Sequence, residues 1–397
     1  MKTKALLFMC LCANVATGMS SIKLSNNYPD KEKVIATTQK KGSDRVVVCD
    51  FSKMNDTISL PLSYLAEEMQ IVKLDNRDEA LVGGRGRTTV TDSYILVSNK
   101  KQTPFRLFDR KGKFITNIGT YGQGPNEYQN TYDEQLDEKH NRIYILPWMT
   151  RKILVFDLQG NAYNPIPLPW NVPKGQFRVN TADSLVTVTT LPFEGMPSVV
   201  WVQDFKGKVK QSVSTHHFKV PRDFSNEVMA TRNTDAYDVM LLVATPTRKD
   251  TLYHYNQKEN RLIPRFTTTY PEDKVPIHSY MELPGCYLGS VQSPVKVSEY
   301  ITVGSKPTWY IVDKKTMKGN YLHLMNDFLG STSPESWPAI RNGYYVMNIE
   351  PLELKEKLEK AIASPKLSKE KKKELIKLSE SLDENGNNVV LFAKLKK

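Results

Sequence analysis

One pattern of apolar and polar residues recurs five times along the chain. A short β-type run leads into a polar turn that contains Asp or Asn, often with Gly, and a second β-type run follows. The pattern is clearest at residues 106–115, 154–163 and 201–210, and looser copies occupy 252–261 and 309–318. Equivalent positions of successive copies lie roughly 50 residues apart, which is the period of a propeller blade built from four short strands. The pattern therefore predicts an all-β fold of the β-propeller class.

The strand-rich runs around these turns divide the chain into six blades. The first blade begins at about Thr88, and the sixth begins at about Trp337, with its clearest strand at 343–347. We expect the fifth blade to contain strands near 287–289 and 300–303. The first five blades are expected to end near Ile118, Pro167, Val213, Phe266 and Leu324. The sequence thus predicts a six-bladed β-propeller over residues 44–397.

The sixth blade is interrupted by a segment with helical periodicity. Residues 351–382 place leucine and isoleucine three or four positions apart, with a break at Ser364-Pro365. We expect a small α-helical insertion here, near the C-terminus. The alternating run at 388–396 then predicts a closing strand. We expect this strand to share a blade with the N-terminal strand near 46–51, because such closure removes exposed sheet edges.

The N-terminal residues have the pattern of a secretory signal peptide. Two lysines precede a short apolar run and small residues follow, so we assign residues 1–20 to a signal peptide and the polar residues 21–43 to a mobile leader. No later stretch is long and apolar enough to predict a transmembrane segment. The sequence therefore predicts an exported protein that is periplasmic or associated with the cell envelope. A lipoprotein is less favoured, because neither Cys10 nor Cys12 follows a small residue.

Charge and cysteine content narrow the classes of partner. The chain has 55 Lys and Arg residues against 43 Asp and Glu, a formal net charge of +12. The charges are scattered, with no basic helix and no stripe of Lys and Arg among aromatics, so nucleic acid is not an expected partner. After export Cys49 and Cys286 remain, which is too few for a disulfide framework. Whether these two thiols are free stays open at this point.

The segment from residue 105 to 160 resembles a known family. It combines the first two copies of the repeat with the loop Gly119-Thr-Tyr-Gly-Gln-Gly-Pro-Asn-Glu-Tyr128. This is similar to the six-bladed β-propellers exported by Bacteroidota, which often carry a Gly-Gln-Gly-Pro-x-Glu-Tyr loop, and more distantly to NHL-type repeats. The resemblance extends over most of residues 45–397 and is strongest in the first two blades. It implies the fold and the exported compartment and no particular activity.

The Gly119–Tyr128 loop allows two interpretations. Gly122 and Gly124 permit positive φ angles, and the loop could present backbone amides and Glu127 to a ligand. It could equally serve only to turn the chain from the outer strand of one blade to the inner strand of the next. It is not a phosphate-binding loop, because no Gly-Lys-Ser/Thr sequence follows.

Local catalytic motifs do not occur in the sequence. The six histidines lack the His-x-x-x-His spacing of a zinc helix, and no Gly-x-Ser-x-Gly nucleophile elbow is present. We therefore assign no catalytic residue and expect no cofactor. A divalent metal held in the central channel stays open as an alternative, because a propeller can assemble ligands from different blades without any local spacing.

Ligand sites in propellers gather where the connections between strands and blades converge at one mouth of the channel. Arginine binds carboxylates with two parallel hydrogen bonds, and aromatic side chains stack on sugar rings or apolar groups. Each such residue could instead cap a blade core or pair with a local acid. The repeat register places these candidate ligand-binding residues near one face: Arg85, Arg87, Tyr121, Gln123, Tyr128, Trp148, Arg151, Phe193, Arg222 and Arg248.

Two functions follow as hypotheses. The first is a non-enzymatic binding or scaffold module of the cell envelope, which recognises a glycan, a peptide or an envelope protein through one face of the propeller. The alternative is a metal-dependent propeller hydrolase or lyase of the lactonase type, with its site in the central channel. The fold alone does not separate them, because one propeller scaffold serves many chemistries.

Overall fold

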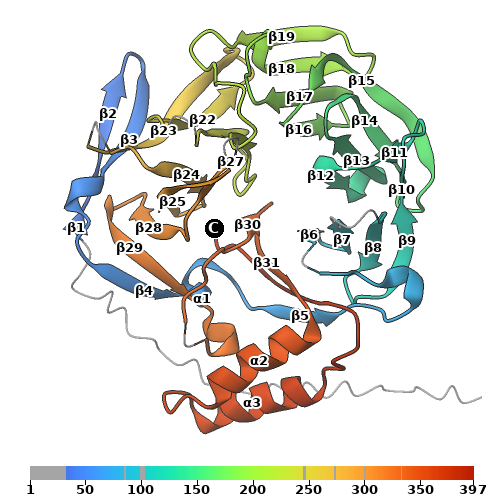
Figure 1. Ribbon diagram of the computed structural model, residues 1–397, viewed down its shortest axis with the longest axis vertical. Coiled ribbons are helices and arrows are strands. Elements are labelled where there is room, and N and C mark those ends of the chain that lie inside the picture. Colours follow the sequence, from blue (N-terminus) through green and yellow to red (C-terminus); the bar gives the residue numbers. More distant parts are fainter. Residues whose placement is uncertain are drawn as a thin grey trace, which may run out of the picture. The chain divides into compact units, whose positions relative to one another are not determined.

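Six antiparallel four-stranded blades form a ring in the computed structural model, as Figure 1 shows. The structure describes residues 33–84, 86–98, 103–244, 247–271, 274–298, 301–331 and 333–397. The predicted all-β, six-bladed propeller with a helical insertion near the C-terminus is confirmed. The expected signal peptide lies outside the described residues.

The first three blades follow one another along the chain. The first contains β6 (Arg87–Val90), β7 (Tyr94–Ser98), β8 (Phe105–Asp109) and β9 (Phe114–Ile118). The second contains β12 (Thr131–Asp137), β13 (Arg142–Pro147), β14 (Thr150–Phe156) and β15 (Ala162–Val172). The third contains β16 (Gly175–Asn180), β17 (Leu185–Thr190), β18 (Ser198–Asp204) and β19 (Val209–Ser214).

The last three blades also include strands from the N-terminal segment. The fourth contains β20 (Glu227–Met229), β21 (Asp238–Leu242), β22 (Thr251–Asn256) and β23 (Arg261–Thr269). The fifth contains β24 (Ile277–Glu282), β25 (Cys286–Gln292), β28 (Thr308–Asp313) and β29 (Lys318–Met325). The sixth contains β30 (Ile340–Arg341), β31 (Tyr344–Ile349), β32 (Val389–Lys394) and β5 (Gln70–Lys73).

Hydrophobic cores lie between neighbouring blades, one for each of the six junctions of the ring. Because each blade is covered on both faces, its inner and middle strands are apolar at successive positions, as at 143–146 in β13 and 199–202 in β18. Trp201 is fully buried between the second and third blades and packs edge-on against Trp170. The continuous apolar runs in the sequence are therefore strands inside the ring.

The recurring turn joins the third and fourth strands of the blades. In the first blade the Asp109 carboxylate accepts hydrogen bonds from the backbone N–H groups of Lys111 (2.8 Å) and Lys113 (3.0 Å), and Gly112 follows with φ +88°. The same pattern recurs in the next two blades, where Gly160 and Gly207 have φ +86° and +84°. The carboxylate closes the turn and the glycine supplies its left-handed residue, which explains the repeated Asp and Gly.

Replacing Gly112 by alanine should therefore destabilise the protein by about 2–4 kcal/mol. Alanine is strained at this φ, and its Cβ would meet the Lys73 carbonyl oxygen at 2.2 Å, where β5 passes the turn. Gly42 is the matched control, because it also has positive φ (+64°) but open space around its Cβ position. We expect Gly42→Ala to cost about 1–2 kcal/mol, measured by urea denaturation of both variants. Equal costs would contradict the role of the contact with β5.

The N-terminal segment runs along the outside of three blades (Figure 1). Strand β3 (Asp44–Asp50) adds in parallel to β23, and β2 (Ala36–Lys41) pairs with β3. Strands β1 (Lys33–Val34) and β4 (Thr57–Pro61) both pair with β29 of the fifth blade. Residues 33–41, which we assigned to a mobile leader, thus form paired strands.

The ring closes through a different strand from the one expected. The closing strand β32 lies between β31 and β5, with Val389 opposite Lys73 and Phe392 opposite Gln70. The expected partner near 46–51 was wrong, because that segment forms β3 at the outer edge of the fourth blade. Closure nevertheless joins the two ends of the chain within one blade.

Several short elements complete the fold. The helical insertion consists of α2 (Pro351–Ile362) and α3 (Lys369–Glu380), which pack on the sixth blade through Leu354, Leu358 and Leu375. Ser368 caps α3 by accepting the N–H of Lys371. The remaining elements are α1 (Leu62–Leu65), η1 (Phe51–Lys53), η2 (Asp78–Ala80), η3 (Glu138–His140), η4 (Asp327–Leu329), β10 (Thr120–Tyr121), β11 (Glu127–Tyr128), β26 (Pro294–Ser298) and β27 (Ile301–Gly304).

We expected a strand of the fifth blade near residues 300–303, and this prediction was wrong. The described part of this run belongs to β27, which pairs with β26 in a separate two-stranded hairpin between β25 and β28. Cys49 and Cys286 are both free and buried. No helix in the described part of the chain is long and apolar enough to cross a membrane.

Candidate functional site

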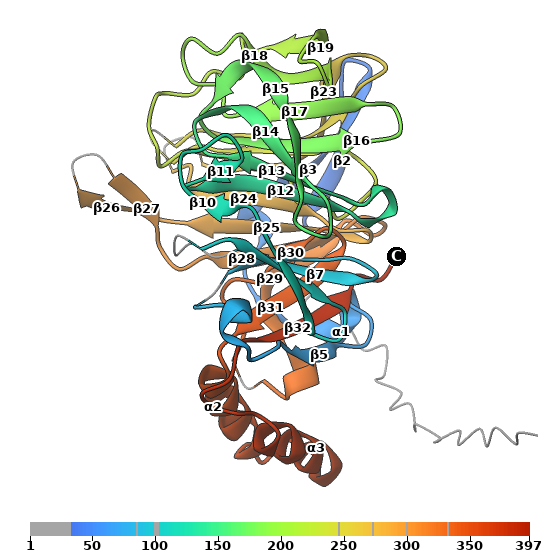
Figure 2. The ribbon, with the colours of Figure 1, turned by 90° about the vertical axis from the view of Figure 1, so that its right-hand side faces the viewer.

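One end of the blades carries the long connections of the chain. Because antiparallel strands alternate in direction, the link from the second to the third strand emerges at the same end as the link to the next blade. This end, which we call the loop face, carries the hairpin β26–β27, the α2–α3 insertion and the Gly119–Tyr128 loop. Figure 2 shows the hairpin projecting from this side of the ring.

The loop face has a pocket of about 710 Å³ between the inner strands of the ring. We call it the axial pocket. Its walls come from the inner strands β6, β16, β20, β24 and β30, from the neighbouring strand β31, and from the connection 331–339 that precedes the sixth blade. Glu353 and Lys357 of α2 also line it. The inner strands of five blades, which are far apart in the sequence, therefore share one cavity.

Arg341, which lines the axial pocket, shares a buried carboxylate with Arg232, and we call the charged residues around this carboxylate the floor of the pocket. Asp133 of β12 is fully buried, and Arg232 and Arg341 each form an ion pair with one of its oxygens. The same carboxylate accepts the Phe177 N–H at 2.9 Å. Arg232 also donates to the Phe177 carbonyl at 2.6 Å. Asp133 thereby connects the second, third, fourth and sixth blades.

A third arginine binds the neighbouring carboxylate. Glu134 is 1% exposed and forms an ion pair with Arg87 of β6. Thr89 donates a hydrogen bond to Glu134 (3.1 Å), and Arg341 lies 3.7 Å from the same oxygen. Arg87 also donates to the Tyr132 carbonyl at 2.8 Å. The two adjacent carboxylates of β12 are therefore held by three arginines from three other blades.

The arginines keep Asp133 ionised although it is buried. Burial raises the pKa of a carboxyl group, but the Arg232, Arg341 and Arg87 guanidinium groups outweigh this and lower the pKa of Asp133. Burial opposes the charge of Arg341 in the same way, while Asp133 and Glu134 raise its pKa. The floor of the axial pocket is therefore a set of charged groups at neutral pH.

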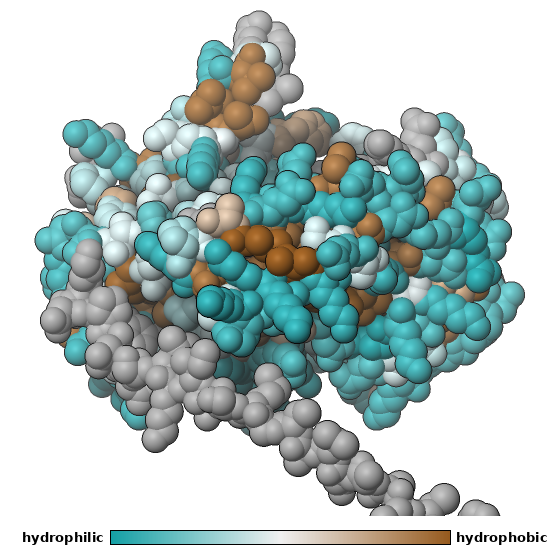
Figure 3. Space-filling view, turned by 90° about the horizontal axis from the view of Figure 1, so that it is seen from below, coloured by the Kyte–Doolittle hydropathy of each residue, from teal (hydrophilic) through white to brown (hydrophobic). Residues whose placement is uncertain are grey.

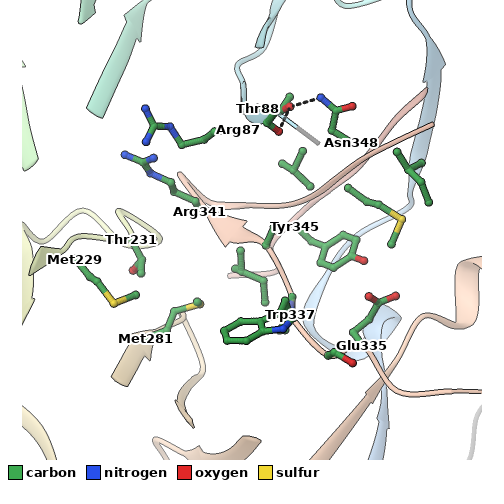
Figure 4. Close-up of a pocket in the computed structure, with 18 of the residues that line it drawn as sticks. Arg87, Thr88, Met229, Thr231, Met281, Glu335, Trp337, Arg341, Tyr345 and Asn348 are labelled. Carbon is green, nitrogen blue, oxygen red and sulfur yellow. Dashed lines mark hydrogen bonds between the residues drawn. The ribbon is translucent and has the colours of Figure 1, made fainter. Parts of the chain in front are cut away.

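The opposite wall of the axial pocket combines apolar and polar residues and holds an exposed tryptophan. Trp337 is 62% exposed and stands between Pro334 and Pro338, which restrict the backbone around it. Figure 4 shows Arg87 and Arg341 on one side of the pocket, with Trp337, Met281 and Met229 across from them. The connection is anchored where Trp309 donates its indole N–H to the Ser336 carbonyl at 2.9 Å.

Comparison with known proteins identifies a family. The model of a domain of unknown function, DUF4934, matches residues 46–394. The chain belongs to the DUF4934 family. No curated protein matches this DUF4934 chain.

Three solved structures are similar to this DUF4934 chain, and the first of them supports its fold. One is a Bacteroides fragilis protein described as exported by inference; it has 14% identity and a TM-score of 0.56, with 86% of this chain and 100% of that chain covered. A DUF4221 family member from Bacteroides vulgatus has 11% identity and a TM-score of 0.43, covering 84% and 97%. Kuenenia stuttgartiensis hydrazine synthase has 12% identity and a TM-score of 0.42, covering 81% and 88%.

The described residues among those predicted from sequence lie on the loop face of this DUF4934 propeller, but they do not form one site. Arg87 lines the axial pocket. Trp148 and Phe193 both pack edge-on against Phe224, with ring centroids 6.4 and 5.8 Å apart, in a separate aromatic cluster. Arg85 lies outside the described residues. Tyr121, Gln123 and Arg222 are exposed.

Three of the predicted residues bind the protein's own backbone. Tyr128 is buried, and its hydroxyl accepts the Phe105 N–H (2.9 Å) and donates to the Ile118 carbonyl (2.7 Å). Arg151 donates to the Pro169 carbonyl at 2.7 Å. Arg248 donates to the Lys219 carbonyl at 2.6 Å and pairs with Asp250. Tyr128 in particular is a core residue, so its tyrosine side chain is explained without any ligand.

The loop with the glycine motif is also held internally. The Glu127 carboxylate accepts the Gly124 N–H at 2.8 Å, and a Cβ at Gly122 would meet the same carboxylate at 1.9 Å. These contacts favour the structural interpretation of the loop, in which the glycines make room for Glu127 and the turn between blades.

Sequence analysis missed most of the axial pocket. It did not select as site residues Asp133, Glu134, Arg232, Arg341 and Trp337. These residues come from different blades, and no local motif links them. One signal was present: Asp133-Glu134 interrupts a β-type run, and adjacent acids inside a strand indicate a polar lining. Among the described residues no three His, Cys, Asp or Glu side chains are grouped as metal ligands.

Proposed function

We propose that this DUF4934 protein is an exported, non-enzymatic binding module of the cell envelope. It takes a glycan, peptide or protein partner through the loop face, with the axial pocket as the binding site. The observation that carries the proposal is the combination in one cavity of about 710 Å³ of two arginines with an exposed tryptophan. Pockets of this size with a few polar groups on an apolar lining are typical of ligand sites.

The rigidity of the scaffold supports a binding role. Arg87 and Arg341 are fixed by ion pairs to buried carboxylates, so little side-chain freedom is lost when a ligand arrives. Export rests on the N-terminal signal pattern, and the similar Bacteroides fragilis protein is described as exported by inference. A periplasmic or envelope-associated location is part of the proposal.

Glycan and peptide arrays probed with the purified mature protein test this function. Trp337→Ala should weaken binding of a true ligand by about tenfold or more, because an exposed aromatic side chain at a pocket commonly dominates the contact energy. Tyr163→Ala is the control, since Tyr163 is exposed (41%) near the turn at the opposite end of its blade. Turnover of glycans, lactones or peptides that is lost in Trp337→Ala would refute a non-enzymatic role.

A further inference from the structure

We infer that the axial pocket takes the C-terminal end of a short peptide, with its free carboxylate toward Arg87 and Arg341 and an apolar last side chain against Trp337. This inference rests on the proposed function, because it specifies the ligand of the same pocket. It depends on the two accessible arginines, on the wall opposite them, and on the polar groups between.

The arginines of the pocket belong to a larger group of charges. Arg178 belongs to the same group of charges as Arg87, Arg232 and Arg341, and it donates to the carbonyl oxygens of Asp235 and Ala236 (3.1 Å each). The buried carboxylates among these arginines are those of Asp133, Glu134 and Asp238. With Asp235, an exposed carboxylate that also acts on Arg178, four guanidinium groups face four carboxylates. A ligand carboxylate would join this group through the exposed parts of Arg87 and Arg341.

The arginines that line the pocket are accessible. Arg87 exposes 32% of its side chain and Arg341 exposes 22%. Both line the pocket and lie on the same side of it (Figure 4). Guanidinium groups bind carboxylates in forked, charge-assisted pairs, which is the chemistry of a free peptide C-terminus.

The wall across from the arginines suits an apolar side chain. Met229, Met281 and Trp337 lie on that side, and methionine adapts its shape to different apolar groups. A ligand that spans the pocket therefore needs a carboxylate at one end and an apolar group close to it. A C-terminal Leu, Met, Phe or Trp residue combines the two within one residue.

Polar side chains between these walls favour a peptide over a simple fatty acid. Gln176, Thr231, Ser336 and Asn348 line the pocket and can exchange hydrogen bonds with peptide amides. An alkyl chain would make no hydrogen bond with them, although Thr231 and Asn348 are also hydrogen-bonded within the protein. Glu335 and Glu353 also line the pocket and disfavour a ligand with several negative charges, such as an acidic glycan.

Matched peptide pairs test the inference on the full mature protein. The probes are tetrapeptides that end in Leu, Met, Phe or Trp, each as the free acid and as the C-terminal amide, titrated by isothermal calorimetry. We expect the best free acid to bind about tenfold or more tightly than its amide, because the amide loses the charge-assisted pair. The same sequence ending in Gly should bind about tenfold more weakly, because it lacks the apolar group.

Two variants locate the binding. Trp337→Ala should weaken binding of the free-acid peptide by about tenfold. Trp148→Ala should leave this affinity unchanged, because Trp148 is an exposed tryptophan of the same face that lies outside the axial pocket. Arg87→Gln should remove most of the preference for acid over amide, with Arg151→Gln as its control. Circular dichroism and a thermal melt establish that each variant is folded before titration.

The outcomes separate the inference from the proposed function. Equal affinity for acid and amide, or unchanged affinity in Trp337→Ala, overturns the peptide C-terminus as the ligand. Failure of all the tetrapeptides to bind also overturns it. The proposed function survives any of these results if the arrays reveal another ligand whose binding depends on Trp337, and it falls if no ligand does.

Discussion

A chain that ends at Asn387 should fail to form a closed propeller. The missing strand β32 lies in the middle of the sixth blade, hydrogen-bonded to β31 on one side and β5 on the other. Its residues 389–393 are at most 1% exposed, and each buried apolar side chain contributes roughly 1.5–3 kcal/mol. Their sum is comparable to the whole stability of a typical domain, about 5–15 kcal/mol, so we expect loss of the cooperative thermal transition.

A chain that ends at Leu395 is the control for this truncation. It retains the whole of β32 and the bridge between Leu395 and Ala66, and it should melt within a few degrees of the full chain. Differential scanning calorimetry on both truncated proteins distinguishes the two cases. A cooperative melt of the shorter chain near the full-length temperature would contradict closure through β32.

Asp133→Asn should destabilise the protein by about 3–5 kcal/mol, the usual result of removing one partner from a buried ion pair. The variant leaves Arg232 and Arg341 without the carboxylate that both of them contact. Asn keeps the size of the side chain and can still accept the Phe177 N–H. The loss of stability therefore measures the effect of removing the negative charge. Urea denaturation at neutral pH measures it, with the exposed Asp235→Asn as the control.

The same variant should change the response to acid. The folded-state pKa of Asp133 lies below its ordinary value, so its contribution to stability is complete above the unfolded pKa and is lost as the pH falls below it. The wild-type protein should therefore lose stability below about pH 4 more steeply than Asp133→Asn. Parallel pH profiles for the two proteins would contradict the ionised state of Asp133.

The blades were predictable because their signal is local. Alternating and continuous apolar runs, separated by Asp and Gly turns, mark each hairpin whatever its neighbours are. The partner of the closing strand was not predictable in this way. The four residues of β5 are mostly exposed, and they give no stronger β signal than 46–51, which has three successive valines but extends the fourth blade.

The candidate site was less predictable for a related reason. Its floor joins residues 87, 133, 232 and 341, which come from four blades and meet only when the ring is closed. Sequence analysis identified Arg87 because it stands at the start of a blade. It also selected Tyr128, whose hydroxyl instead ties two backbone segments together, and a buried tyrosine has the same appearance in sequence as one that awaits a ligand.

The two ends of the blades differ in a way that bears on how such a protein diversifies. At the loop face, the link between second and third strands ranges from the tight turn at Trp148-Met149 to the complete α2–α3 insertion, while the opposite end keeps short Asp-containing turns. The six cores between the blades hold the ring together, whereas link residues such as Phe193 and Leu354 pack in separate clusters. Insertions and substitutions at the loop face can therefore accumulate with little effect on stability, so relatives with the same ring can evolve different specificities.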